Sequence, residues 1–140
     1  MDEWLAKGGV IICNRYVTSN MAHQSARLPE EKREEFIRWI DELEYRQHKM
    51  PRPDLVIYLY VPWRIGLELT AKKADKRHYV KGTDLAEKDI NHRQEAEKMY
   101  VYLSRTQKKW VKIDCVRNNK ILPAEEIFER VKEKVNEKLT

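Results

Sequence analysis

The sequence predicts a parallel α/β fold, and three observations lead to this prediction. Apolar runs at 10–13, 54–61 and 110–115 have the composition of strands, and the first is a continuous β-branched run typical of a strand buried on both faces. Amphipathic helical patterns lie between these runs. Strands that alternate with helices indicate a parallel sheet with helices on both faces. The length of 140 residues suits one domain, or a large piece of one.

Composition excludes several classes of protein. Charged residues make up 36% of the chain, the net charge is +5, and no apolar run approaches the roughly 20 residues that a membrane helix needs. The N-terminus carries no basic-then-apolar leader, so nothing indicates secretion. Cys13 and Cys115 lie far apart without the spacing of a zinc site, and both are expected to be buried thiols in a reducing cytoplasm.

The N-terminal part is expected to contain three helices and one strand. Gly8 and Gly9 stop a first helix that ends near residue 7. The strand 10–13 follows, and capping side chains at 18–20 precede a short helix over 21–28. Pro29 then suits the first turn of an amphipathic helix over 30–48.

The C-terminal part repeats the alternation of strand and helix. Residues 54–61 form the strongest strand pattern of the chain, and 110–115 the last one. The other expected elements are a helix from Pro62 to Lys73, a basic exposed loop over 72–83, a helix over 84–108, a turn at Asn118 and Asn119, and a final helix from Pro123. The four tryptophans are expected in the core or at its boundary.

One segment carries residues suited to nucleotide recognition. Arg15 follows the first predicted strand, at the sheet edge where α/β proteins bind ligands, and its planar donors suit a phosphate. Asn20, His23 and Gln24 fall within one helical turn, and amide side chains can read the edge of a base. Two alternatives stay open: Arg15 pairs with a neighbouring acid to hold two helices, or Ser19 and Asn20 only cap a helix.

The sequence resembles the thymidylate kinase family over nearly its whole length. Asn14-Arg15-Tyr16 followed by Ser19-Asn20-Met21-Ala22-His23-Gln24 is similar to the Asp-Arg-Tyr block of the family. The matching segments continue in the family's order: the strand at 53–59, a basic lid at 77–89 and the last strand at 110–114.

The resemblance implies binding of dTMP by the N-terminal part. It assigns the phosphate of dTMP to Arg15, the thymine ring to Asn20, and the neighbouring pocket to His23 and Gln24. Such kinases transfer the γ-phosphate of ATP to dTMP, a reaction that depends on positioning and charge neutralisation.

The resemblance also implies site residues in the C-terminal part. It makes Arg15 and Arg77 the catalytic residues, Arg77 and Lys81 the ATP-binding residues, and Asp84 a substrate-binding residue. Arg77 and Lys81 would close over the phosphates of ATP in a lid of about 72–89, and Asp84 matches an acid near the bound nucleotide. ATP and Mg²⁺ are therefore the implied cofactors. Asn14 replaces the family's aspartate, so no metal-binding residue is assigned, and Ala86 stands where some relatives have tyrosine.

The largest departure from the family is the lack of a phosphate-binding loop. None of the four glycines belongs to a Gly-x-x-x-x-Gly-Lys-Ser/Thr motif. We therefore expect 1–140 to be a single partial domain, the C-terminal portion of an incomplete three-layer nucleoside monophosphate kinase fold. In the family's strand order, 2-3-1-4-5, the missing strand lies between 10–13 and 54–61. We therefore expect one of two outcomes: a compact three-stranded remnant, or a chain that depends on a complementary phosphate-loop segment or on a homodimer.

Three functions remain open from the sequence. The first is a nucleoside monophosphate kinase represented by its dTMP-binding and lid portion, inactive by itself. The second is a non-catalytic remnant that binds nucleotide or holds a partner. The third is a nucleic-acid-binding module using 72–83, which ranks last because the stretch is short, has one aromatic residue and adjoins acids at 84–89.

Overall fold

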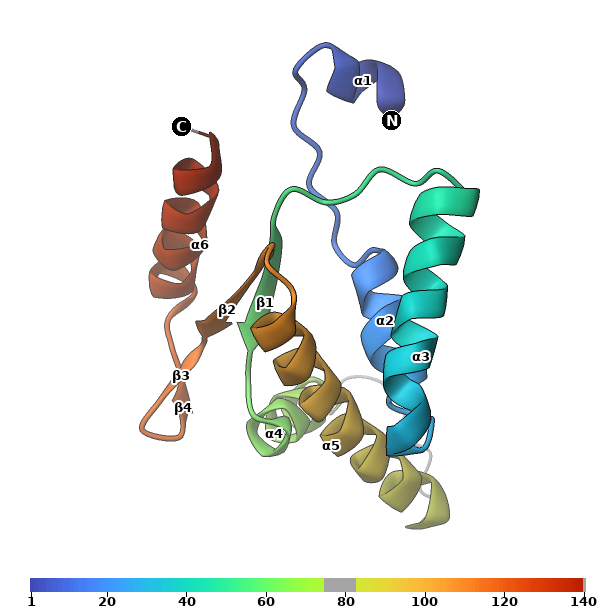
Figure 1. The fold of residues 1–140 in the computed structure, drawn as a ribbon. Coiled ribbons are helices and arrows are strands. Elements are labelled where there is room, and N and C mark those ends of the chain that lie inside the picture. Colours follow the sequence, from blue (N-terminus) through green and yellow to red (C-terminus); the bar gives the residue numbers. More distant parts are fainter. Residues whose placement is uncertain (75–82, 140) are drawn as a thin grey trace. The chain divides into compact units, whose positions relative to one another are not determined.

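The computed structural model describes residues 1–74 and 83–139, and the side chains of 1–71 and 89–139. The chain divides into two compact units, Met1–Pro53 and Asp54–Thr140, and each is described by itself. Figure 1 shows the order of the helices and strands along the chain. Within the described residues, no helix combines the length and apolar character needed to cross a membrane.

The first unit begins with a short helix that ends where the glycines predict. Helix α1 spans Asp2–Ala6, and Gly8 follows in the left-handed region with φ of 76°. Gly9 lies so close to the Trp4 indole that a Cβ on Gly9 would overlap it. The Trp4 ring donates a hydrogen bond to the Val10 carbonyl (3.2 Å) but stays 60% exposed, so Trp4 is not part of a core.

Two longer helices form the core of this unit. Helix α2 spans Val17–Ser25, and α3 spans Glu30–Asp41 and continues as the π-helix η1 over Glu42–Gln47. The apolar faces of α2 and α3 pack together, with these side chains buried: Val17, Met21, Ala22, Ala26, Ile37 and Ile40. Trp39 is 53% exposed, contrary to the expected core or boundary position.

The prediction of a strand at 10–13 is wrong. These residues have no regular secondary structure, and Cys13, expected to be buried, is exposed. Ile12 is 91% exposed. A strand exists only where a second strand accepts and donates its hydrogen bonds, and no described residue pairs with this segment. The β-branched residues of this segment favour an extended backbone, but they do not provide a partner strand.

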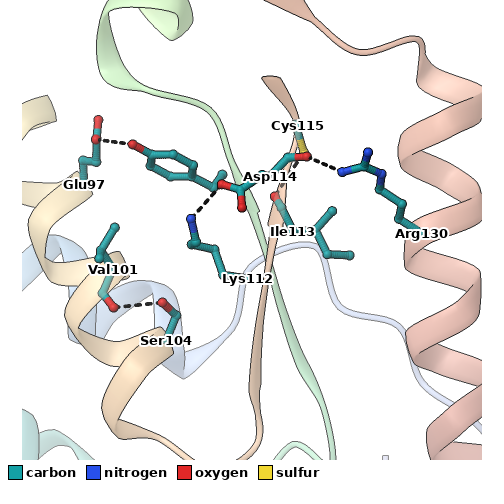
Figure 2. Close-up of polar contacts among 9 residues, drawn as sticks. Glu97, Val101, Ser104, Lys112, Ile113, Asp114, Cys115 and Arg130 are labelled. Atoms are coloured by element: carbon teal, nitrogen blue, oxygen red, sulfur yellow. Dashed lines mark hydrogen bonds and ion pairs between the residues drawn. The ribbon is translucent and has the colours of Figure 1, made fainter. Parts of the chain in front are cut away.

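The second unit contains a parallel pair of strands between helices. Strand β1 (Val56–Tyr60) pairs with β2 (Trp110–Asp114) in the register Leu59 opposite Ile113. Helices α4 (Trp63–Ala74) and α5 (Thr83–Thr106) follow β1, and α6 (Ala124–Leu139) follows β2. Figure 2 shows α5 and α6 on opposite sides of the strands, and this arrangement, with the parallel pairing of β1 and β2, is compatible with the predicted α/β fold. This sheet has two strands in the described residues, not the expected three.

Aromatic and aliphatic side chains fill the space between the sheet and α5. Tyr58 stacks on Tyr100 with ring centroids 4.9 Å apart, and Tyr100 also contacts Trp110. Leu103 of α5 is completely buried, and Cys115 just after β2 is 1% exposed, as expected for this thiol. Burial raises the pKa of the Cys115 thiol, although Arg130 acts against this effect.

A hairpin follows β2 and was not predicted beyond its turn. Strands β3 (Val116–Arg117) and β4 (Lys120–Ile121) pair in antiparallel orientation. Asn118 and Asn119, with φ of 50° and 58°, form the turn between them. Positive φ at both central residues is the requirement of a type I′ turn, which asparagine tolerates better than most residues.

Candidate functional site

The backbone at Arg15 is strained. Its φ is 69°, in the left-handed region, and the next residue, Tyr16, is extended and forms the N-cap of α2. A non-glycine residue in this region costs about 1–2 kcal/mol. Such strain gathers at sites that bind or react. Arg15 therefore lies at a sharp change of backbone direction immediately before the helix.

The Arg15 side chain is exposed and makes no ion pair or hydrogen bond with another described residue. Arg52 of the same unit differs, because it donates two hydrogen bonds to the Asp41 carboxylate at 2.7 and 2.6 Å. Within the described residues, Arg15 therefore does not join two helices through an ion pair with an acid. The Arg15 guanidinium can therefore donate hydrogen bonds to an external anion.

The start of α2 places backbone N–H groups beside Arg15, and one of them, that of Ser19, already donates to the Tyr16 carbonyl (2.9 Å). No side chain caps this helix, and its first residue is Val17. The first amides of a helix have no partner within it, and they favour an anion. Thr18, Ser19 and Asn20, predicted to cap a later helix, lie inside the first turn of α2 instead. The alternative that Asn20 serves as a cap is therefore wrong.

Three polar side chains share one face of α2. Asn20, His23 and Gln24 stand at positions i, i+3 and i+4, which a helix brings onto one side. Asn20 and Gln24 are exposed and His23 is half-buried, whereas Met21 and Ala22 are buried against α3. We call these three residues the polar face of α2. The helix thus presents donors and acceptors to one side while its apolar side packs in the core.

The start of α2 is held by residues far away in the sequence. The Tyr16 hydroxyl donates a hydrogen bond to the Pro51 carbonyl (3.0 Å). The Arg52 guanidinium lies 4.4 Å from the centre of the Tyr45 ring. Burial and the nearby Tyr16 raise the pKa of Tyr45 to about 12, and Arg52 acts in the opposite direction. No local sequence pattern indicates this support, because its members are separated along the chain.

The structure describes only some of the predicted site residues of the second unit. Arg77 and Lys81 lie outside the described residues. Asp84 and Ala86 belong to α5, but their side chains lie outside the described part. The assignments for Arg77, Lys81 and Asp84, and the lid over 72–89, stay predictions.

The residue that replaces the family's aspartate offers Mg²⁺ no carboxylate. They contain no group of three histidine, cysteine, aspartate or glutamate side chains able to hold a metal ion. Asn14 is exposed and neutral, whereas Mg²⁺ prefers at least one carboxylate.

Sequence reasoning missed a polar cluster at the C-terminal end of β1. The Glu97 carboxylate accepts hydrogen bonds from the Tyr60 hydroxyl (2.9 Å) and from the backbone N–H of Trp63 (2.6 Å), at the start of α4. Lys112 bonds to Asp114 and lies 4.2 Å from the centre of the Tyr60 ring. Figure 2 shows Glu97, Lys112 and Asp114 on the α5 side of the sheet. Glu97 thus fixes α4 to the edge of the sheet where ligands bind in α/β proteins.

A parallel α/β unit, together with a helix start that presents an unpaired arginine, is typical of proteins that bind phosphorylated ligands. A model of the family "Thymidylate kinase" matches residues 1–135. Thymidylate kinases of Mycobacterium tuberculosis, from the strains CDC 1551 / Oshkosh and ATCC 25618 / H37Rv, are both 30% identical over 95 residues. The chain belongs to the thymidylate kinase family. Each match covers 68% of this chain and 44% of the relative, so the chain spans about half the length of these enzymes.

Proposed function

We propose that residues 1–140 supply the dTMP-recognition part of a thymidylate kinase, the enzyme that transfers the γ-phosphate of ATP to dTMP. The observation that carries the proposal is the exposed, unpaired Arg15 at a strained position directly before α2. The polar face of α2 follows within ten residues of it. Membership of the family supplies the reaction, and the first unit supplies groups suited to its acceptor substrate.

Each group has a distinct role in the proposed complex. The Arg15 guanidinium donates two parallel hydrogen bonds to the phosphate of dTMP, and the first amides of α2 contribute to the same anion site. Asn20 bonds to the thymine ring, which offers both donors and acceptors. His23 and Gln24 line the space beside the sugar and base. Recognition thus divides between the phosphate, held by Arg15, and the base, held by α2.

We propose that catalysis needs a complementary segment that carries the phosphate loop. Residues 1–140 contain no Gly-x-x-x-x-Gly-Lys-Ser/Thr motif, and Asn14 stands where the family has aspartate. In the complete enzyme the segment would hold ATP and Mg²⁺, while Arg77, Lys81 and Asp84 would approach the nucleotide from the lid. Because both cysteines are free thiols, we propose a reducing, cytoplasmic setting for this assembly.

Titration of the chain with dTMP, followed by NMR of its backbone amides, tests the proposal. We expect saturable shifts at Arg15 and along α2, with weaker binding of thymidine, which lacks the phosphate. The amides of α6 serve as an internal reference. Absence of shifts in 15–24 at millimolar dTMP, or equal affinity for thymidine, would refute the recognition role.

A fusion tests the catalytic part. The strand, phosphate loop and following helix of the M. tuberculosis enzyme, joined to this chain, should restore formation of dTDP. If the fusion binds both nucleotides without turnover, Asn14→Asp should raise the rate, because the carboxylate can help to organise Mg²⁺. A folded fusion that binds neither nucleotide would contradict the proposal.

A further inference from the structure

Two successive residues before α2 have different backbone conformations. Arg15 is left-handed, with φ of 69°, and Tyr16 is extended, with φ of −155° and ψ of −162°. Together these two conformations determine the direction in which the Arg15 side chain leaves the chain relative to the first turn of α2. Tyrosine is not a preferred N-cap residue, and its side chain caps no amide of α2. The contact that holds this arrangement therefore comes from elsewhere in the first unit.

The Tyr16 hydroxyl makes such a contact. It donates a hydrogen bond to the Pro51 carbonyl (3.0 Å), which lies 35 positions further along the chain. The Tyr16 side chain is half-buried, and burial, together with the nearby Cys13 and Glu44, raises the pKa of its hydroxyl. A hydroxyl with a raised pKa keeps its proton at neutral pH, so Tyr16 acts as the donor.

The acceptor of this hydrogen bond is held by its own backbone. The Met50 N–H donates to the Glu44 carbonyl (2.9 Å), which ties the chain just before Pro51 to η1. The rings of Pro51 and Pro53 fix the φ angles of these two residues. None of these constraints involves the Arg52 side chain. The Pro51 carbonyl is thus a well-defined point to which the start of α2 is attached.

We propose that Tyr16 is a positioning residue for Arg15, because its hydrogen bond to Pro51 keeps the N-cap of α2 extended. The Arg15 guanidinium then stays where it can bind the phosphate of the nucleotide. This inference rests on the proposed function, in which Arg15 binds the phosphate of dTMP. Tyr16 contacts no ligand itself and acts on binding only through Arg15.

The magnitude of the effect follows from the strain at Arg15. Strained residues persist only where the surrounding structure holds them. The cost of a left-handed arginine corresponds to roughly a five- to thirtyfold preference for the relaxed backbone, and the loss of one hydrogen bond to roughly two- to tenfold. When only a fraction of the molecules has the competent conformation, the apparent affinity falls by that fraction. Tyr16→Phe should therefore weaken dTMP binding about three- to tenfold.

Two other roles for Tyr16 predict a different pattern. A tyrosine that contacted the base or the sugar would change the binding of thymidine as much as that of dTMP. A purely structural tyrosine would lower the stability of the first unit and affect both ligands alike. Only a residue that acts through the phosphate-binding Arg15 changes the preference for dTMP over thymidine.

Titration of two matched variants of the full chain tests this pattern. Tyr16→Phe removes the hydroxyl and keeps the half-buried ring. Tyr45→Phe makes the same change at a half-buried tyrosine whose hydroxyl has no hydrogen bond to a described residue. We expect about three- to tenfold weaker binding of dTMP to Tyr16→Phe, unchanged binding of thymidine, and no change of either in Tyr45→Phe. Equal losses of the two ligands in Tyr16→Phe would overturn the proposal.

A double-mutant cycle tests whether the effect passes through Arg15. In Arg15→Gly there is no guanidinium for Tyr16 to position. Adding Tyr16→Phe to this variant should therefore cause no further loss of dTMP affinity. The same loss in the wild-type and Arg15→Gly backgrounds would overturn the proposal, because Tyr16 would then act independently of Arg15.

The backbone chemical shifts of Arg15, measured without nucleotide, separate this inference from the proposed function. The left-handed signature at Arg15 should be lost in Tyr16→Phe and kept in Tyr45→Phe, while the shifts of Ala22 and Ile37 in the core confirm that both variants are folded. Unchanged Arg15 shifts in Tyr16→Phe would overturn the positioning role. Equal affinity of the wild-type chain for dTMP and thymidine, with the expected change at Arg15, would instead contradict the recognition of dTMP alone.

Discussion

Replacing Arg15 by glycine separates the backbone strain at this position from the proposed contact with phosphate. Glycine accepts a φ of 69° without a steric penalty, so the substitution removes strain of about 1–2 kcal/mol. It also adds about 0.5–1 kcal/mol of conformational entropy to the unfolded chain. The two effects oppose each other, and the free energy of unfolding should change by between about 0 and +1.5 kcal/mol.

The effect on binding should be larger and specific to the phosphate. Loss of a charge-assisted bidentate contact costs about 2 kcal/mol, which corresponds to roughly 30-fold weaker binding of dTMP. Thymidine has no phosphate, so its affinity should not change. Asn20→Ala should instead weaken both ligands alike by about 1 kcal/mol, because the base is common to them.

Calorimetric or NMR titration of each variant with both ligands, beside its melting temperature, measures this difference. Arg52→Gly is the control arginine, since its bidentate pair with Asp41 is structural. That pair is largely solvent-exposed, so the control should lose about 0.5–1 kcal/mol of stability and no selectivity for the phosphate. Equal losses of dTMP and thymidine binding in Arg15→Gly would refute the assignment, as would a large loss of stability.

The chain alone should form no dTDP from ATP and dTMP, because it lacks a phosphate loop; ATP-dependent product formation by protein free of host kinases would contradict this. Leu103→Ala should lower the free energy of unfolding by about 3 kcal/mol, because Leu103 is completely buried. Leu139→Ala, at a 63% exposed residue, should change it by less than about 0.5 kcal/mol in the same denaturant titration. Desolvation acts to raise the pKa of Glu126, but hydrogen bonds from Arg130 and Arg117 lower it overall from 4.5. The stability that Glu126 contributes should be complete above pH 4.5 and lost as the pH falls through the lowered pKa. Glu126→Gln should reduce this acid sensitivity, and an unchanged slope of stability against pH would contradict the assignment.

The regular elements were predictable because their signals are local. The helical spacing of Phe36, Ile37 and Ile40 indicated α3, and these side chains do form the apolar side of that helix. The apolar runs around β1 and β2 indicated strands, and these two strands do pair in parallel. The run at 10–13 has equally good local preference. It failed as a strand because pairing depends on a partner, which no local pattern reports.

Local signals led to the candidate site, which stays a prediction, but they did not indicate what supports it. The place of Arg15 after a β-branched run, and the spacing of Asn20, His23 and Gln24, identified the segment. The hydrogen bond from Tyr16 to Pro51 joins residues 35 positions apart, so periodicity cannot indicate it. The left-handed backbone of Arg15 was equally hidden, because arginine has no preference for that region.

The π-helix that extends α3 has a consequence for insertions and deletions. In Glu42–Gln47 the hydrogen bonds span five residues, as in the bond from the His48 N–H to the Leu43 carbonyl. A π-helical turn accommodates one more residue than an α-helical turn. It therefore behaves as a single-residue insertion absorbed inside a helix. We expect relatives that lack one residue here to continue α3 as a regular helix, with the side chain at Tyr45 rotated away from Tyr16.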